Sequence, residues 1–553
     1  MADPLIRLDI AASEQCLRNS DVLEEILDHL SSTSDPGDLA ITRQSLLWIA
    51  STCRFLSPSA VKFLWRKLDN IIPLLFLLPS FAVRGGIYGL FGTMEAQDWG
   101  AFDRHAAFVK EISYENRRHI HIDPSVYVRL ALRPTPVLPN LARLECGDTE
   151  TFVAAEAVLY MQSPLQTIEL AGGDQMPNTT ASMFTSMTLS SIYGSATVIH
   201  LSILILDNQP FDILSEGISL TKLTSLELRR MKGNMSTALF RRIGSIRNLR
   251  SFTADTECLR AALANPFDSG RLVPMSELFM ELTHLHLNAT QTSNSPILLL
   301  NFLRDIGTRN LRSLVLRRMA ALPASVPIPI RGATRGRGFR GSAVVRFPGS
   351  RVGQGYIHTI AHRWSRSLRR LDFDFSYLHE EELTPVNTLK SLRSLTFSGR
   401  LSPLDSPPHS SLCTKLCAEL PELEFLSLGL EWHPATWGSL LRPPYVAPSI
   451  VDLFCLAEKC KGLQEIELPI LTNALPPVSS TPAISHGLRK INVRSTKTPP
   501  DTLGLARHLD RLFPRLNSVV CAEGGTEEKA AWAHVQNLVF VFQDVRRTAL
   551  AQR

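Results

Sequence analysis

One glycine-rich stretch of this 553-residue sequence has the spacing of a nucleotide-binding motif. Gly336, Gly338 and Gly341 match the pattern Gly-x-Gly-x-x-Gly, in which a strand, a tight turn and a helix N-terminus hold a pyrophosphate. That chemistry needs a strand before the glycines, but Pro327 and Pro329 stand there, and no P-loop lysine is present. The sequence therefore does not predict a nucleotide site.

Pairs of histidines and cysteines could bind a metal, but each pair lacks part of the required pattern. His358 and His362 are four residues apart on a predicted helix, as in zinc proteases, yet Thr359 stands where the glutamate base would be. Cys413 and Cys417 have no second pair at zinc spacing. No Ser-His-Asp or Gly-x-Ser-x-Gly arrangement can be placed. We therefore expect no catalytic residues, no metal and no cofactor.

The strongest charged feature is a run of arginines without acids. No Asp or Glu occurs from residue 306 to 371, and the basic insertion at about 325–355 holds Arg331, Arg335, Arg337, Arg340, Arg346 and Arg351. Arginine-glycine loops can follow phosphates, so contact with RNA or an acidic partner is one interpretation. A flexible basic insertion is the favoured interpretation. The net charge of +6 does not by itself indicate nucleic acid.

The elements that would position such residues are repeated along the chain. A template, apolar-x-x-apolar-x-apolar, begins clearly at residues 141, 165, 223, 282, 311, 368, 392, 423, 463, 488 and 516, and weakly at 198 and 249. Several copies follow a helical stripe, such as Ile357, Ile360, Ala361 and Trp364. A helix and a strand per unit predict an irregular leucine-rich-repeat solenoid, a curved parallel sheet with outer helices. An ordinary α/β domain with parallel strands is the alternative.

Alternation within each predicted strand separates buried from outward residues. In the copy at 223, Leu226 and Leu228 should face inward, while the residues between them face outward. Outward strand residues are the ones expected to line a target surface. They are Ser225, Glu227, Arg229, His284, His286, Arg370, Asp372, Asp374, Glu465 and Glu467.

A short amphipathic helix precedes the repeats, and two more helices follow it. Its apolar residues Val22, Leu23, Ile26, Leu27 and Leu30 lie along one face, and Asn19 or Ser20 can cap its start. Three short helices bury only a small core. Such a module would gain stability from a partner that covers its remaining apolar face.

The order of these features resembles the F-box in the form common among fungal F-box proteins. Besides the first helix, Cys53-Arg54 and Leu64-Trp65 match pairs of that family. The resemblance implies binding to a Skp-type adaptor of a cullin ubiquitin ligase; a plain helical cap on the next domain is the alternative. The residues expected to support adaptor docking are Val22, Leu23, Ile26, Leu27, Leu30 and Trp65.

These features together predict an α/β chain of five parts. They are a flexible N-terminus at 1–15, an F-box at 16–80, a linker or irregular N-terminal cap at 81–137, the repeats at 138–521 and a C-terminal capping helix at 522–553. Within the linker, residues 118–134 alternate like a strand.

The predicted function is that of a non-catalytic substrate-recognition subunit of a Skp-cullin-F-box-type E3 ubiquitin ligase, which binds a target protein through its repeats. The alternatives are a repeat scaffold without a ligase role, or binding of nucleic acid or an acidic partner through the Arg/Gly loop. Nine dispersed cysteines fit reduced thiols, and no apolar leader opens the chain. We therefore expect a location in the cytoplasm and/or nucleus, with no membrane partner.

Overall fold

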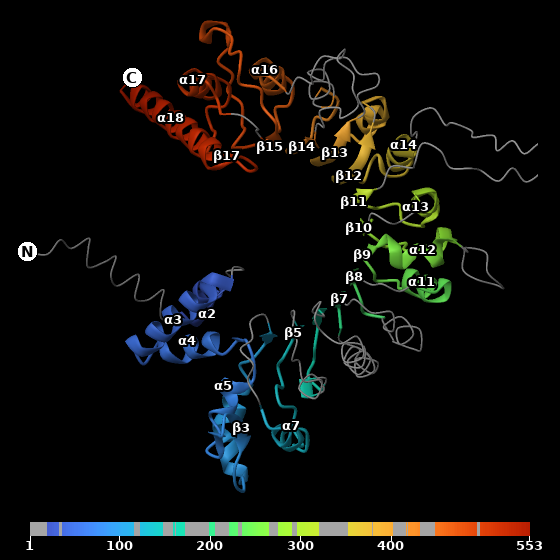
Figure 1. Ribbon diagram of the computed structural model, residues 1–553. Helices are drawn as coiled ribbons and strands as arrows, with labels where there is room; N and C mark the ends of the chain where they lie inside the picture. The colour runs from blue at the N-terminus through green and yellow to red at the C-terminus, as the bar shows by residue number, and fades with distance from the viewer. Residues whose placement is uncertain are drawn as a thin grey trace, which may run out of the picture. The chain divides into compact units, whose positions relative to one another are not determined.

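The protein is described here from a computed structural model (Figure 1). The described residues are 19–31, 36–114, 122–146, 159–160, 162–171, 198–204, 221–229, 235–264, 275–289, 296–319, 352–378, 380–401, 416, 418–431, 448–494 and 498–552. The chain divides into two compact units, Met1–Gly233 and Asn234–Arg553.

The first unit begins with three helices and has three more among its first strands. They are α2 (Ser20–Ser31), α3 (Pro36–Thr52), α4 (Ser57–Leu64), α5 (Ile72–Leu75), α6 (Gly100–Ala106) and α7 (Pro124–Ala131). Asn19 caps α2, since its Oδ1 accepts the backbone N–H of Asp21 at 3.0 Å. A proline in the first turn of α4 suits a position whose N–H has no partner within the helix.

A hairpin and a parallel sheet complete the described part of the first unit. The hairpin joins β2 (Phe81–Arg84) to β3 (Ile87–Leu90) through Gly85 and Gly86, whose φ values of 59° and 82° suit glycine. The sheet runs β1-β4-β5-β6-β7-β8, with parallel pairing at every step. Its strands are β1 (Lys67–Leu68), β4 (Glu111–Ser113), β5 (Arg143–Cys146), β6 (Thr167–Ala171), β7 (His200–Leu204) and β8 (Ser225–Arg229).

The expected strand at 118–134 is wrong for its second half, because residues 124–131 form helix α7. Asp123 accepts the backbone N–H of Ser125 at 2.8 Å, and Pro124 occupies the first helical position. This start signal outweighs the alternation of apolar residues, which a short helix can imitate.

The second unit continues the pattern with parallel strands paired in chain order, β9 to β17. They are β9 (Ser251–Asp255), β10 (His284–Asn288), β11 (Ser313–Met319), β12 (Arg370–Leu378), β13 (Ser394–Leu401), β14 (Phe425–Glu431), β15 (Glu465–Leu468), β16 (Lys490–Val493) and β17 (Ser518–Cys521). Every one of the thirteen sequence templates is a strand that begins two residues after the template start. The expected α/β architecture, a parallel sheet with helices, is confirmed.

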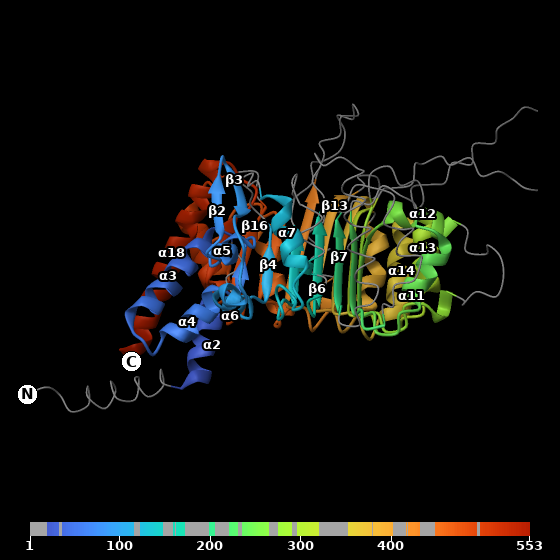
Figure 2. The same cartoon turned by 90° about the horizontal axis from the view of Figure 1, so that it is seen from below.

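Helices lie between many of these strands, and the last helix, α18, follows β17. They are α11 (Thr237–Gly244), α12 (Thr256–Ala264), α13 (Pro296–Asp305), α14 (Val352–Trp364), α16 (Ile450–Lys459), α17 (Thr502–Leu512) and α18 (Thr526–Ala551), with 3-10 turns η2 (Met275–Glu277), η3 (Glu380–Thr388) and η4 (Val478–Ser480). Helices α11 to α14 follow one another along one side of the sheet (Figures 1 and 2).

The core of the second unit lies between this helical layer and the sheet. On β10, Leu285 and Leu287 are buried, whereas the residues that alternate with them reach solvent. Four buried aromatic rings fill the space between α11, α13 and strand β9, with centroids 5.3 to 6.1 Å apart: Phe240, Phe252, Phe279 and Phe302. Each buried ring contributes about 1.5–3 kcal/mol by removal of apolar surface from water.

Helix α18 packs against α17 and β17 at the end of the chain. Trp532, Val535 and Val539 are buried there. The Gln536 side chain accepts the backbone N–H of Val519 at 2.8 Å, and the Gln543 amide donates to the Leu516 carbonyl at 2.9 Å. The helix thus satisfies backbone groups in and just before β17, whose partner among the described strands is β16.

Candidate functional site

A small core holds the first three described helices together. Leu23 and Leu27 from α2 pack with Leu46 from α3 and Phe63 from α4. Two ion pairs add to this contact: Lys62 Nζ of α4 lies 2.7 Å from Glu24 Oε1 of α2, and Arg66, two residues after α4, pairs with Asp28 of α2. These pairs are partly exposed, so the apolar core supplies most of the stability.

Helix α2 presents a second apolar stripe to solvent. Val22, Ile26 and Leu30 are 37%, 42% and 44% exposed, whereas Leu23 and Leu27 are 4% and 1% exposed. The exposed three are spaced at i, i+4 and i+8, so they share one helix face. The structure therefore divides the predicted adaptor-binding residues into a buried pair and an exposed stripe.

Helix α3 adds exposed apolar residues that the sequence reasoning did not assign to binding. Trp48 is 62% exposed, and Ile41, seven residues earlier, lies near it on the helix face and is also exposed. The sequence does indicate exposed apolar residues on this helix. The run from Leu46 to Ile49 is apolar throughout, and four consecutive helical residues cannot all face one core.

Trp65, the remaining predicted adaptor residue, lies just after α4 and is half-buried. Its ring centroid is 4.8 Å from that of His105 on α6, so it packs within the first unit. Trp65 therefore packs inside the first unit, and only its exposed part is available to an adaptor.

The predicted target-binding residues of the first unit lie on β8. Ser225, Glu227 and Arg229 are half-buried, alternating with the buried Leu226 and Leu228. Arg229 pairs with Glu227 along the same strand. The charges of Glu227 and Arg229 therefore partly neutralise each other within the strand.

In the second unit, the predicted residues of β10 and β12 lie on neighbouring parts of the sheet. His284 is an exposed residue whose imidazole is partly covered. Partial burial, together with the nearby Arg312 guanidinium, lowers the pKa of this imidazole. Arg370 is exposed at the start of β12, and Asp374 is half-buried. Asp372, by contrast, is only 5% exposed, and Arg317 Nη2 lies 3.4 Å from its Oδ2.

His286 on β10 is half-buried. Like His284, it projects between the buried leucines of that strand. Because β10 pairs with β11 in register, His286 lies opposite Val315. The two histidines thus occupy successive outward positions of one strand.

The acidic residues of β15 are compensated by neighbouring strands. Glu465 pairs with Lys490 at 2.7 Å. Glu467 accepts from Arg494 Nε at 2.7 Å and from Ser427 Oγ at 3.0 Å. The strand face at β14 to β16 is therefore an internally paired surface rather than a row of free carboxylates.

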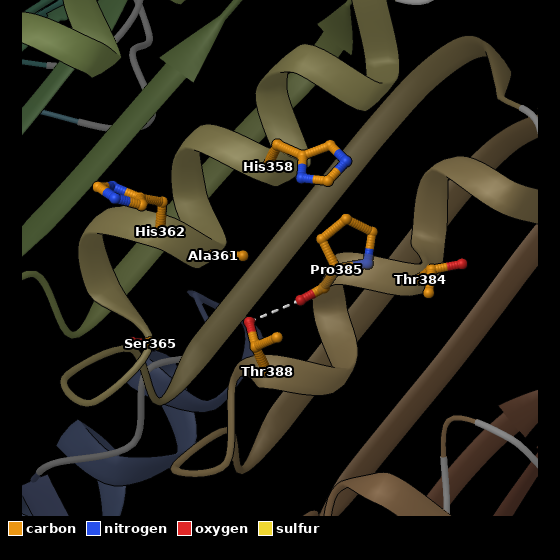
Figure 3. Close-up of a pocket in the computed structure, with 7 residues that line it drawn as sticks. All are labelled: His358, Ala361, His362, Ser365, Thr384, Pro385 and Thr388. Carbon is orange, nitrogen blue, oxygen red and sulfur yellow. Dashed lines mark hydrogen bonds between the residues drawn. The ribbon is translucent and has the colours of Figure 1, made fainter.

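A hollow of about 610 Å³ lies on the helical side of the second unit, between α14 and η3 (Figure 3). His358 and His362 from α14 line it together with Thr384, Pro385 and Thr388 from η3. Thr388 Oγ1 donates to the Pro385 carbonyl at 2.8 Å. No Asp or Glu is among the described residues that line the hollow.

The described residues hold neither a metal cluster nor a membrane span. Within them, no group of three or more His, Cys, Asp or Glu side chains is arranged to hold a metal ion. No helix in the same ranges has the length and apolarity of a membrane span. The Arg/Gly loop up to residue 351, Cys413 and Cys417 lie outside the described residues.

Comparison with known proteins finds weak structural similarity. No protein-family model matches the chain, and no curated protein matches it. The chain is similar to a chain of the crystal structure of the Rad7 and Elc1 complex in yeast, with a TM-score of 0.38 and 12% identity, over 68% of this chain and 79% of that chain. A likeness of this degree carries no functional argument, so functional conclusions rest on the residues of this chain.

Proposed function

We propose that the protein is a substrate-recognition subunit of a Skp-cullin-F-box-type E3 ubiquitin ligase. Its N-terminal helices form an F-box that docks to a Skp-type adaptor, and its leucine-rich repeats hold a target protein. The observation that carries the proposal is the divided stripe of α2, with Leu23 and Leu27 in the core and Val22, Ile26 and Leu30 exposed.

The exposed stripe supports docking because its burial by a partner would be favourable. Full burial of such a side chain is worth about 1.5–3 kcal/mol, so covering the exposed fraction of each gives about 1 kcal/mol. Exposed apolar residues on α3, Trp48 among them, add to the surface available. The resemblance of residues 16–80 to an F-box gives this surface its partner.

In this proposal the chain performs no chemistry. It holds a target close to the ubiquitin-transfer machinery and so raises the target's effective concentration there. Ubiquitin transfer belongs to the other subunits of the ligase.

Co-purification tests the proposal. Full-length chain with Ile26→Asp, co-expressed with a Skp-type adaptor, should lose the adaptor, because a carboxylate in an apolar interface loses its hydration without gaining a partner. Val128→Asp on α7 is the matched control: it also places an acid at an exposed apolar position of the first unit, and it should keep the adaptor. Leu27→Asp is unsuitable, because Leu27 is buried and its replacement would break the helical core.

Retention of the adaptor by Ile26→Asp would contradict the docking role of α2. The chain would then be better explained as a repeat scaffold without a ligase partner.

A further inference from the structure

One edge of the sheet in the second unit carries a regular set of arginines. In each repeat, two positions precede the strand: one four residues before its first residue and one directly before it. For β9, β11 and β12 both positions hold arginine, giving Arg247 and Arg250, Arg309 and Arg312, and Arg366 and Arg369. All six are exposed.

The backbone ladder brings these arginines side by side. The N–H of Thr283 bonds to the Arg250 carbonyl, that of Arg312 to Thr283, and that of Arg369 to Arg312, each at 2.8 Å. The next step joins Arg393 to Arg369, also at 2.8 Å. At about 4.8 Å per strand, the row from Arg250 to Arg393 spans about 19 Å.

The six arginines of β9, β11 and β12 have no ion pair within the ranges that the structure describes. Their surroundings are also poor in acid, since no Asp or Glu occurs from 306 to 371. Glu281, in the turn before β10, is an exposed acid of the edge itself. Arg370, predicted as a target-binding residue, lies next to this arginine edge and is exposed as well.

The neighbouring repeat shows what these positions bind. Before β13 the same two positions hold Lys390 and Arg393, and both pair with glutamates of the following repeat. Lys390 Nζ lies 2.9 Å from Glu419 Oε2, and Arg393 Nη1 lies 3.3 Å from Glu424 Oε1. Carboxylates thus already occupy this edge at β13, and the open positions at β9, β11 and β12 continue it.

We propose that the arginine edge of β9, β11 and β12 is a docking site for a glutamate- or aspartate-rich segment of a target protein. A guanidinium offers paired N–H donors that match a carboxylate, and two arginines per strand provide a dense, ordered row of them. Nucleic acid fits less well, because single strands are held by stacking on aromatic side chains, and no exposed Phe, Tyr or Trp lies on this edge among the described residues.

This inference rests on the receptor role proposed above and names the chemistry of its target. The two can fail separately, because peptide binding is measured with the purified chain and no adaptor, whereas co-purification measures the adaptor alone. If peptide binding fails, the co-purification result still stands, and the reverse is also true.

The experiment uses a fluorescent oligoglutamate peptide of about eight residues, which spans the row when extended. The full chain with Arg309→Glu, Arg312→Glu and Arg369→Glu should bind it at least about tenfold more weakly, because three exposed ion pairs are lost and three repulsive contacts appear. Raising the salt concentration should weaken wild-type binding as well.

The matched control reverses three cations on the same edge at β15 to β17, with Lys461→Glu, Arg489→Glu and Arg515→Glu. All three are exposed and the change in net charge is identical. The control should bind the peptide as the wild type does. Equal weakening in both variants would mean that net charge alone attracts the peptide and would overturn the proposal, as would tighter binding of a single-stranded RNA of similar length. Circular dichroism of both variants confirms that they fold.

Discussion

Separate truncation of Leu27 and Ile26 to alanine should distinguish folding from binding on helix α2. Leu27 is 1% exposed and packs with Leu23, Leu46 and Phe63, so its truncation leaves a cavity. We expect the helical module to lose about 2 to 4 kcal/mol of stability. Ile26 is 42% exposed, so the same truncation should cost less than about 1 kcal/mol.

The loss at Leu27 is large compared with what else holds α2 in place. The two ion pairs of α2, Glu24 with Lys62 of α4 and Asp28 with Arg66 just after α4, are partly exposed. Pairs of this kind contribute about 0.2–1 kcal/mol each, so they cannot offset the cavity. The module should therefore open locally while the sheets of both units stay folded.

Native-state hydrogen exchange on the full chain measures this opening, because it reports residues 20–64 separately from the sheets. Leu27→Ala should raise exchange in these helices by about 30-fold or more, and Ile26→Ala by less than about fivefold. Adding the Skp-type adaptor should slow exchange in the wild type and in Leu27→Ala, but much less in Ile26→Ala.

Equal opening of the helices by Ile26→Ala and Leu27→Ala would contradict the exposed position of Ile26. Ile26 would then be packed in solution, and the apolar face assigned to the adaptor would not exist.

Two further predictions concern the second unit. His486 and His508 are buried, and desolvation lowers the pKa of both imidazoles. As the pH falls, the unfolded chain therefore binds these protons before the folded chain does, so the stabilisation is complete above about pH 6.5 and declines below it. Urea unfolding should show a lower midpoint at about pH 5.5 than at about pH 7.5. The substitution His508→Asn should reduce that difference. Gly399 has a φ of 125°, and a Cβ there would lie 1.8 Å from a backbone oxygen of β12. Gly399→Ala should therefore lower the unfolding free energy by about 2 kcal/mol or more, and an unchanged thermal midpoint would show that β13 relaxes freely.

The pH prediction follows from how the two imidazoles are bonded. His486 Nε2 donates to the Cys460 carbonyl at 2.6 Å, and its Nδ1 accepts the N–H of Leu488 at 3.0 Å. His508 likewise uses both nitrogens, with Thr481 and the Pro476 carbonyl. A second proton on His486 would remove the acceptor that the Leu488 N–H uses.

Local patterns in the sequence were enough to locate the strands and their buried sides. Leu285 and Leu287 are buried, as alternation predicted, because the two-residue period of a strand is a property of the backbone alone. The same rule failed for residues 124–131, where the Asp123 cap and Pro124 begin a helix. A short apolar alternation does not by itself distinguish a strand from a helix.

The site could be predicted only as a set of outward or amphipathic residues. The sequence placed Val22, Leu23, Ile26 and Leu27 on one helix face but did not say which of them the core would cover. Alternation placed Asp372 outward, but the residue is only 5% exposed and its side chain pairs with Arg317 of the neighbouring strand. These outcomes depend on neighbours that are far away in the sequence.

The sequence by itself determined the repeating unit, the strand positions and the amphipathic start of the chain, since each follows from side chains within a few residues of one another. Only the tertiary structure decided which apolar residues remain exposed on α2 and α3 and that arginines from three repeats form one edge. The physical reason is that strand register aligns Arg250, Arg312 and Arg369, which are 62 and 57 residues apart in the chain, and a local pattern carries no information about that alignment.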